Sequence, residues 1–493
     1  MAATDTGLGL LGDEERWTGR IYGDGWSDAP EQIDVRQPAT GEVIARAGVA
    51  DGEVVAAAGA SAAAAQREWA ATPFPERARI LRRAADLFES SADEITRWMV
   101  RETGSIPPKI AVEVTNSANQ IHQATGLVTE PLGYVLPTQI PDRTSVAHRI
   151  PVGVVGVITP WNFPVVLALR SIAPALALGN AVILKSDPNT PVTGGVLIAR
   201  VFEEAGLPPG VLHVFTGGAE VGGALIADPN VGMVTFTGST AAGRAVGELA
   251  GRLLKRAVLE LGGNSPLIVL EDADLDAASS AGAFGSFLHS GQICLATSRH
   301  LVHEKVADAY VEALAERARR LPVGDPERDE VALGPLINEK QARRVRRIVD
   351  ESVEAGARVV AGGTPEGPFY PATVLADVVP AMPVYREEIF GPVAPVVTFA
   401  SDEEAIALAN ANDYGLSAAI HSRSIDRAER LAARVHSGMV HINDMTINEE
   451  SPAPFGGQAG SGNGLHFGGV ANLDLFTEWQ WRTSRPVATP FPF

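Results

Sequence analysis

Residues 152–178 read VGVVGVITPWNFPVVLALRSIAPALAL, and this stretch decides the fold class of the chain. Residues 152–158 form a continuous, mainly β-branched apolar run, which is typical of a strand buried on both faces of a parallel sheet. Residues 165–178 are typical of a helix, and Gly179 with Asn180 ends it. A buried strand that leads into a helix is the repeating unit of an open α/β sheet.

The same alternation continues on the C-terminal side. Further strands are expected at residues 181–185, 212–215, 233–236 and 257–259, with a helix at 192–205 that Gly206 ends. A second alternating block begins near residue 267, with helices around 306–320 and 339–355 and strands around 393–399 and 439–442. The sequence therefore predicts an α/β protein with two open-sheet domains of the Rossmann-like type.

Three other segments complete the predicted organisation. Residues 76–102 have helical periodicity, and Gly104 follows as a stop signal. Residues 133–150 alternate β-branched and polar residues around a turn signal at Pro141-Asp142, and the tail from residue 471 to 493 has no helical period. We expect the last two segments to be extended arms that need a partner sheet.

Composition excludes several classes of function. The 493 residues carry a formal net charge of −19, a field that repels phosphate backbones and anionic membrane surfaces. The single cysteine, Cys294, cannot form a disulfide within the chain or a multi-cysteine metal site, and no H-E-x-x-H metal motif is present. The sequence predicts a protein that binds neither nucleic acid nor a membrane and holds no metal.

No targeting or membrane segment is expected. Residues 1–17 are acidic and lack an apolar run, so they do not form a signal peptide. The apolar window 150–169 is interrupted by prolines and glycines that would break a spanning helix. The expected location is the cytoplasm. A G-x-G-x-x-G pattern at residues 7–12 follows no strand, so we do not expect it to bind a nucleotide.

Six short blocks could carry chemistry. They are P-W-N-F at 160–163, F-T-G-S at 236–239, E-L-G-G-N at 260–264, G-Q-I-C at 291–294, E-I-F-G-P at 388–392 and P-F-G-G at 454–457. Each has a purely structural alternative. Asn162 could donate to a developing oxyanion or cap the next helix, and Ser239 could approach a phosphate or act only as an N-cap. Glu260 could be a base or a solvated surface group, and Cys294 a nucleophile or an inert apolar residue. His289 is expected to be structural.

In this order the six blocks resemble the aldehyde dehydrogenase superfamily, over residues 151–464. The wording is most similar to benzaldehyde and vanillin dehydrogenases in three places: F-L-H at 287–289 before G-Q-I-C, K-S-D-P at 185–188, and W-Q-W at 479–481. The resemblance implies oxidation of an aldehyde to the carboxylic acid with NAD or NADP. The route would pass through a cysteine thiohemiacetal, loss of hydride to the nicotinamide, and hydrolysis of a thioester.

The resemblance also implies roles for residues. Cys294 would be the nucleophile, Glu260 the general base, and Asn162 the oxyanion donor together with the Cys294 main-chain N–H. Lys185 and Glu388 would hold the two riboses, Gly238 and Ser239 would approach the pyrophosphate, and Phe390 would line the nicotinamide site. Other residues expected to bind cofactor are Thr159, Trp161, Gly243 and Leu261.

Two departures from the family pattern affect specificity. NAD-preferring relatives often have Glu three residues after the lysine, where this chain has Pro188, so we expect both cofactors to be used, although Asp187 lies close by. Many relatives have Lys after P-F-G-G-x, where this chain has Ala459, so no role is assigned there. Phe163 and Leu167 could line a pocket for a flat aromatic aldehyde or belong to the core.

Four alternative functions remain open at this point. They are oxidation of an aliphatic aldehyde or semialdehyde, transfer of the acyl group to coenzyme A, thiol-dependent ester hydrolysis, and a catalytically silent structural role. The presence of Glu260 favours hydrolysis over transfer to coenzyme A, and the presence of Cys294 and Asn162 argues against a silent relative.

The resemblance further implies a homodimer or homotetramer joined through the arms. The expected division of the chain is a dinucleotide-binding domain at 1–132 and 151–262, a catalytic domain at 263–470, and oligomerisation arms at 133–150 and 471–493.

Overall fold

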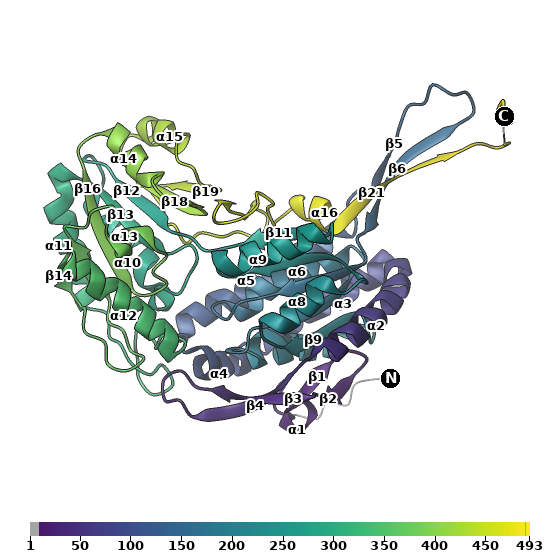
Figure 1. Cartoon of the computed structure of the whole chain (residues 1–493), viewed down its shortest axis with the longest axis horizontal. Coiled ribbons are helices and arrows are strands. Elements are labelled where there is room, and N and C mark those ends of the chain that lie inside the picture. The colour runs from purple at the N-terminus through teal and green to yellow at the C-terminus, as the bar shows by residue number, and fades with distance from the viewer. Residues whose placement is uncertain (1–8, 489) are drawn as a thin grey trace.

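The structure is a computed structural model that describes residues 9–488 and 490–493. It has two lobes, each built on an open sheet, and a slender arm that projects from one of them (Figure 1). The predicted α/β fold with two open, largely parallel sheets is confirmed.

Five parallel strands form the centre of the first sheet, in the spatial order β11-β10-β7-β8-β9. They are β7 (Val154–Ile158), β8 (Ala181–Ser186), β9 (Leu212–Thr216), β10 (Val231–Thr237) and β11 (Arg256–Glu260). The chain progresses from β7 to β9 on one side and then returns to place β10 on the other side of β7. The order therefore reverses between β7 and β10, and ligands of such sheets bind at the carboxyl ends of the strands beside this reversal.

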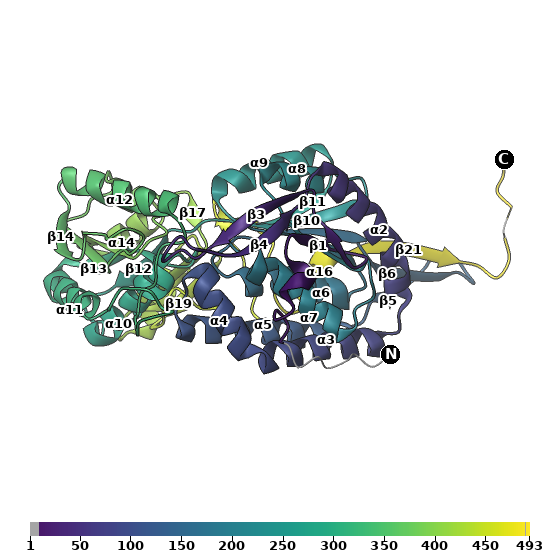
Figure 2. The same cartoon turned by 90° about the horizontal axis from the view of Figure 1, so that it is seen from below.

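Helices cover both faces of this sheet, as the uninterrupted apolar run at β7 predicts (Figure 2). Val155 and Val157 belong to a core shared with helices on one face, whereas Val154 and Ile158 belong to a core on the other. The first face carries α3 (Phe74–Ser90), α5 (Pro107–Leu127), α6 (Pro164–Ala177) and α7 (Leu197–Ala205); the second carries α2 (Gly52–Ala71), α8 (Ala219–Ala227) and α9 (Thr240–Arg252).

Four N-terminal strands extend the first sheet beyond β9 and were not expected from the sequence. They are β1 (Arg20–Tyr22), β2 (Trp26–Asp28), β3 (Glu31–Arg36) and β4 (Val43–Val49). The single helix expected at 76–102 is two helices, α3 and α4 (Ala92–Thr103), because Ser91 leaves the helical conformation between them. Gly104 does end α4, in the left-handed region with φ of 67°.

The second lobe has a seven-stranded sheet in the order β14-β15-β16-β13-β12-β18-β19. The strands are β12 (Ser265–Val269), β13 (Thr297–His303), β14 (Arg358–Ala361), β15 (Thr373–Ala376), β16 (Val393–Phe399), β18 (Ser417–His421) and β19 (Met439–Ile442). Only the β14–β15 pair is antiparallel among them. The flanking helices include α10 (Leu275–Phe287), α11 (Ala307–Arg319), α12 (Glu339–Glu354), α14 (Asp402–Ala409) and α15 (Ile425–Ala432).

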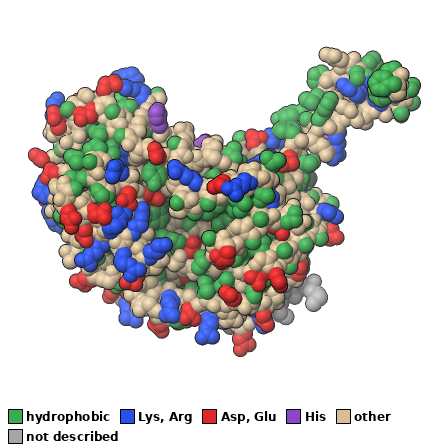
Figure 3. All heavy atoms as spheres, in the orientation of Figure 1, with side chains coloured by type: hydrophobic (Ala, Val, Ile, Leu, Met, Phe, Trp, Pro, Cys, Tyr) green, Lys and Arg blue, Asp and Glu red, His purple; other side chains and the backbone are tan. Residues whose placement is uncertain are grey.

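The arm is a three-stranded antiparallel sheet of β5 (Gly133–Val135), β6 (Thr144–Pro151) and β21 (Thr477–Ser484). Hydrophobic side chains gather on its surface away from the lobes (Figure 3). One part of the tail differs from the extended chain expected there. Residues Ala471–Phe476 form the short helix α16, because Leu473, Leu475 and Phe476 are buried in the core of the first lobe.

The N-terminal glycine pattern at residues 7–12 is described only from Gly9 onward. Gly7 and Leu8 lie outside the described residues. The main-chain N–H groups of Leu10 and Leu11 donate to the carboxylate of Glu94, at 2.8 and 2.9 Å, so this part of the motif is engaged with the protein itself. Over the described range, no helix is long and apolar enough to cross a membrane.

Candidate active site

A cavity of about 500 Å³ lies where the carboxyl ends of β7, β10 and β11 meet loops of the second lobe. Nine of the residues singled out from the sequence line it: Trp161, Asn162, Leu167, Gly238, Ser239, Leu261, Cys294, Glu388 and Phe390. The cavity sits beside the reversal of strand order between β7 and β10, which is the expected place for a ligand in this fold.

Cys294 lies on the cavity wall, partly exposed, between a strained turn and β13. Three consecutive residues before it, His289, Ser290 and Gly291, have φ of 51°, 52° and 68°. Such left-handed conformations are unfavourable for His and Ser and are concentrated at functional sites. Gly291 is required, because a Cβ there would lie 2.1 Å from the carbonyl oxygen of Gly391.

The thiol of Cys294 has a perturbed ionisation. Burial raises its pKa to about 12, and the negative charges of Glu388, Glu260 and Glu449 act in the same direction. The guanidinium of Arg170 opposes them by favouring the thiolate. The nucleophilic form of this cysteine therefore depends on a nearby positive charge.

Glu260 is the last residue of β11 and is only 2% exposed, so it is not the solvated surface group that a lone Glu usually is. Neither of its carboxyl oxygens has a hydrogen-bond partner among the described residues. Burial raises its pKa well above the usual value, and Arg170 and the nearby main-chain N–H of Gly457 act in the opposite direction. Glu260 does not line the cavity, although its neighbour Leu261 does, and its charge influences the ionisation of Cys294.

Asn162 follows β7 and is 3% exposed. Its side chain does not cap α6. Instead, Nδ2 donates to the carbonyl oxygen of Gln292 at 2.9 Å, and Gln292 precedes Cys294 by two residues. One N–H of the amide is used in this bond, the amide carries a second N–H, and Asn162 lines the cavity.

Arg170 and Glu449 were not singled out from the sequence. Arg170, on α6, is 3% exposed and pairs with Glu449 at 2.5 Å, and its guanidinium lies 3.8 Å from the ring centre of Phe455. Its Nε and Nη1 have no partner among the described residues. An arginine inside the apolar helix pattern at 165–178 was the one available signal, since arginine is rarely buried without a partner.

The loop that carries Glu388 and Phe390 is held by α12. Arg344 donates to the carbonyl oxygens of Glu388 and Ile389, at 2.5 and 3.1 Å, and Gln341 donates to that of Phe390 at 2.7 Å. The ring of Phe390 meets that of Trp161 edge-to-face, with centroids 5.5 Å apart. Burial raises the pKa of Glu388 to about 7, against the opposing effects of the Gly263 N–H and of Arg344.

Five of the predicted site residues do not line the cavity: Thr159, Phe163, Lys185, Gly243 and Glu260. Lys185 donates to the carbonyl oxygens of Gly217 and Ser186, at 2.5 and 3.2 Å, and Pro188 lies on an adjoining cavity. Gly243 packs against Leu261, since a Cβ there would lie 2.1 Å from a methyl carbon of that leucine. Ser239 is the N-cap of α9, and its hydroxyl accepts from the Ala242 N–H. Ser239 also lines the cavity.

Comparison with known proteins is consistent with this geometry. The model of the aldehyde dehydrogenase family matches residues 26–482. The chain belongs to the aldehyde dehydrogenase family. It is 54% identical to a vanillin dehydrogenase from an Amycolatopsis species, over 98% of this chain and 99% of that protein. It is 52% identical to a benzaldehyde dehydrogenase (NAD⁺) from Pseudomonas putida, over 97% of this chain and 98% of that protein.

One solved structure is similar in fold over nearly the whole chain. The salicylaldehyde dehydrogenase from Pseudomonas putida G7, complexed with salicylaldehyde, has a TM-score of 0.93 and 37% identity, covering 97% of this chain and 99% of that one. As an aldehyde dehydrogenase, the protein is an enzyme that oxidises an aldehyde to the acid with a nicotinamide cofactor.

The cavity of this aldehyde dehydrogenase fits a nicotinamide dinucleotide. The N-terminus of α9, at Ser239, faces it and can receive a phosphate, and the Glu388 carboxyl can accept from sugar hydroxyls. Trp161 and Phe390 give one part of the wall an aromatic surface suited to a planar ring. In the part of the chain that the structure describes, no group of three or more His, Cys, Asp or Glu residues could hold a metal ion.

Proposed function

We propose that this aldehyde dehydrogenase oxidises aromatic aldehydes, with Cys294 as the nucleophile, Asn162 as the oxyanion donor and Glu260 as the base. One observation carries the assignment of these roles. Cys294 and Asn162 line the same cavity, and the buried carboxyl of Glu260, whose charge acts on Cys294, has no hydrogen-bond partner among the described residues.

These groups can perform each step of the reaction that this chain must catalyse. The Cys294 thiolate adds to the carbonyl carbon, and the resulting oxyanion accepts from the free N–H of Asn162 and from the Cys294 main-chain N–H. When bound, the nicotinamide ring supplies the hydride acceptor. Glu260 then takes a proton from water as the water oxygen attacks the thioester carbon, and the Cys294 sulfur leaves as the thiolate.

Arg170 supports both charged groups in this proposal. The reaction needs a thiolate at Cys294 and a carboxylate at Glu260, yet burial raises the pKa of each. Arg170 is the positive charge that opposes the shift at both residues. We therefore assign Arg170 the role of stabilising the deprotonated forms of the nucleophile and the base.

An apolar cluster around Cys294 supports an aromatic substrate. The cluster consists of buried Ile293, Leu295, Ala296, Leu416 and Phe455, with partly buried Phe163, Leu288, Met439 and Ile447 against it. The side chains packed around Cys294 are therefore apolar, and apolar surroundings favour a flat apolar ring over a short polar chain. Leu167 lines the cavity, and Phe163, which does not, packs against the apolar cluster beside Cys294, so Leu167 and Phe163 are the proposed pocket residues. Relatives named for vanillin, benzaldehyde and salicylaldehyde support the same substrate class.

Use of both NAD and NADP is the proposed cofactor specificity. Pro188 offers no carboxylate that could hydrogen-bond the ribose hydroxyls of NAD or repel the 2′-phosphate of NADP. Lys185 lies 2.5 Å from the Gly217 carbonyl oxygen, and burial lowers its pKa while Asp187 and Glu220 raise it. Lys185 and Glu388 are proposed to hold the two riboses, and Gly238 and Ser239 to lie against the pyrophosphate. Thr159, Trp161, Gly243, Leu261 and Phe390 complete the proposed cofactor site.

A homo-oligomer joined through the arms is the proposed assembly. Tyr134 stacks on Trp479 at 5.8 Å between centroids, and both rings, with Val135 and Trp481, are at least half exposed. A protruding three-stranded sheet with exposed aromatic side chains is stabilised when a second copy covers it. The proposed division of the chain is a cofactor domain (1–132 and 151–262), a catalytic domain (263–470) and arms (133–150 and 471–493).

A panel of aldehydes assayed with NAD and with NADP, with and without coenzyme A, tests the proposed specificity. We expect kcat/KM to be higher for benzaldehyde than for short aliphatic aldehydes, free benzoate to form without coenzyme A, and both cofactors to support turnover. A higher kcat/KM for short aliphatic aldehydes would contradict the aromatic assignment. Undetectable turnover with NADP would contradict the dual use of cofactors.

A further inference from the structure

A buried ion pair that does not line the cavity lies beside the main chain of Asn162. Lys109 and Glu113 stand one turn apart on α5, with Nζ 2.5 Å from Oε2. Their side chains are 1% and 0% exposed. Within a helix, such a pair is more favourable when Glu precedes Lys, which is the reverse of the order here, so the pair supports α5 less than the opposite order would.

The contacts of the pair instead lead to the segment that carries Asn162. Lys109 Nζ donates to the main-chain carbonyl oxygen of Asn162 at 2.8 Å and lies 4.0 Å from the ring centre of Phe163. Glu113 Oε1 accepts from the N–H groups of Val165 and Val166, at 2.9 and 3.4 Å. Two side chains from one helix thus hold four of the five residues from Asn162 to Val166.

Glu113 performs the task that a capping residue usually performs. The N-cap of α6 is Phe163, which has no side chain able to accept, and Pro164 follows with no N–H. The N–H groups of Val165 and Val166 are the donors that the first turn of a helix leaves without partners. Because Glu113 accepts both, the start of α6 is fixed by α5 rather than by its own sequence.

Lys109 holds the main chain of Asn162, and a second contact holds the amide of its side chain. Its amide donates to the carbonyl oxygen of Gln292, and the Gln292 side chain accepts from the Ile337 N–H at 2.9 Å. The Asn162 amide is therefore held between a fixed main chain, through Lys109, and a fixed acceptor near Cys294. An oxyanion donor lowers a barrier only when it is already oriented before the charge develops.

Stability alone is a weak reason for such a pair. Removing two charges from water is costly, and buried ion pairs can often be replaced by apolar residues without loss of stability. We propose that Lys109 and Glu113 are positioning residues, which act on the reaction by fixing the main chain of Asn162 so that its amide points at the oxyanion. This inference rests on the proposed role of Asn162 and assigns no contact between substrate and either residue.

The test is a double variant, Lys109→Met with Glu113→Gln, studied with benzaldehyde and NAD. The introduced glutamine keeps an oxygen that accepts from Val165 and Val166, and no unpaired charge is left buried. We expect kcat to fall by about tenfold or more with the KM for NAD within twofold of wild type, because cofactor contacts are untouched. Hydrolysis of p-nitrophenyl acetate, which also forms an oxyanion, should fall in parallel.

The decisive readout is the same pair of substitutions in an Asn162→Ala background. If Lys109 acts through Asn162, the double variant causes no further loss of kcat once the amide is absent. A loss of equal size in both backgrounds, or a kcat within twofold of wild type in the double variant alone, would overturn the proposal. Should the double variant fail to fold, Lys109→Gln with Glu113→Gln, which keeps a polar side chain at both positions and leaves no charge buried, supports the same comparison.

A matched control neutralises an ion pair in the other lobe, with Arg427→Met and Asp402→Asn. Its kcat should stay within about twofold of wild type in both backgrounds. Failure of the proposed function is a separate outcome: Asn162→Ala by itself would then leave kcat unchanged, whatever the Lys109 and Glu113 variants do.

Discussion

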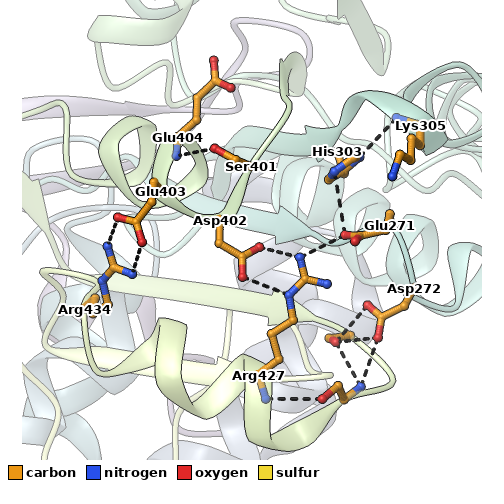
Figure 4. Close-up of polar contacts among 12 residues, drawn as sticks. Glu271, Asp272, His303, Lys305, Ser401, Asp402, Glu403, Glu404, Arg427 and Arg434 are labelled. Carbon is orange, nitrogen blue, oxygen red and sulfur yellow. Dashed lines mark hydrogen bonds and ion pairs between the residues drawn. The ribbon is translucent and has the colours of Figure 1, made fainter.

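Two clusters of charged residues in this molecule differ in whether the charges have partners. Around Arg427 in the second lobe, polar groups from several elements are joined by hydrogen bonds and ion pairs (Figure 4). Arg427 donates to Asp402 at 3.0 Å and to Glu271 at 3.1 Å, and Asp272 accepts from the Ser422 hydroxyl at 2.9 Å. Hydrogen bonds from Arg427 lower the pKa of both Glu271 and Asp402.

In the cluster around Arg170, by contrast, several buried polar atoms lack a hydrogen-bond or ion-pair partner in the described part of the chain. We call this cluster incomplete and the cluster around Arg427 complete. Arg170 is paired with Glu449 alone and keeps two nitrogens without partners, and Glu260 has none for either oxygen, among the described residues. Burial raises the pKa of Glu260 and of Cys294. The complete cluster ties structural elements together, whereas the incomplete one leaves buried polar groups without partners among the described residues, a pattern that is concentrated at functional sites.

The largest expected effect comes from removing the nucleophile. Cys294→Ala should lower kcat by at least about 10⁴-fold, because no other thiol exists in the chain to form the thioester. Steady-state formation of reduced cofactor from benzaldehyde measures this. Unchanged thermal unfolding serves as the control, and residual oxidation near the wild-type rate would refute the proposed mechanism.

Removal of the base should have the next largest effect. Glu260→Gln should lower steady-state kcat by about 10²–10⁴-fold, because water attack on the thioester loses its base. The first turnover should survive as a burst of reduced cofactor, measured by stopped flow. Glu102→Gln is the matched control: Glu102 is fully buried and accepts from the N–H groups of Val192 and Thr193, and its loss should leave kcat within about threefold.

Removal of the positive charge of Arg170 should shift the dependence of kcat/KM on pH. Both proposed groups act in their deprotonated forms, and Arg170 keeps their pKa values lower than burial alone would set them. In Arg170→Met, the rising limb of log kcat/KM should therefore move to higher pH by about one unit, a tenfold loss at neutral pH. The pH profile of Arg170→Lys, which keeps a positive charge, should lie between those of wild type and Arg170→Met. Superimposable profiles for the Arg170→Met variant and wild type would show that Arg170 does not influence these groups.

The smallest effect on catalysis is expected in the complete cluster. Arg427→Met should lower the free energy of unfolding by about 1–2 kcal/mol and leave kcat within about twofold. Glu271 and Asp402 have lowered pKa values, so their stabilisation is present at neutral pH and is lost as pH falls through those values. Urea unfolding at several pH values should thus show a smaller acid-side loss in the variant than in wild type. Equal losses of unfolding free energy in the variant and in wild type would show that Arg427 does not stabilise the Glu271 and Asp402 carboxylates.

Local patterns were sufficient for the five parallel strands of the first sheet, and for β12, β16 and β19 of the second. They did not predict β13, at the centre of the second sheet, or its companions β15 and β18. The uninterrupted apolar run at β7 required burial on both faces, and the helices that provide it were found there. The strands β1 to β4 were not predicted, because strands as short as Arg20–Tyr22 at the edge of a sheet, with few buried residues, carry little periodicity.

For the candidate site, the sequence indicated residues at the ends of apolar strands, such as Asn162 and Glu260. It could not indicate Arg170 with Glu449, or Lys109 with Asn162. These partners are 279 and 53 positions apart in the chain, as Arg170–Glu449 and Lys109–Asn162. Such contacts arise because α5 packs on α6, and because the loop after β19, which carries Glu449, reaches Arg170 on α6. No local sequence pattern describes this packing.

The most direct test of the proposed mechanism is intact-protein and peptide mass spectrometry of the Glu260→Gln variant after it is mixed with benzaldehyde and NAD. The account predicts that the variant accumulates one benzoyl group per chain, on the peptide that contains Cys294, because the thioester forms and is hydrolysed slowly. Wild-type enzyme under the same conditions should show little of this adduct. A variant that forms reduced cofactor without any acylation of Cys294, or that carries the benzoyl group elsewhere, would contradict it.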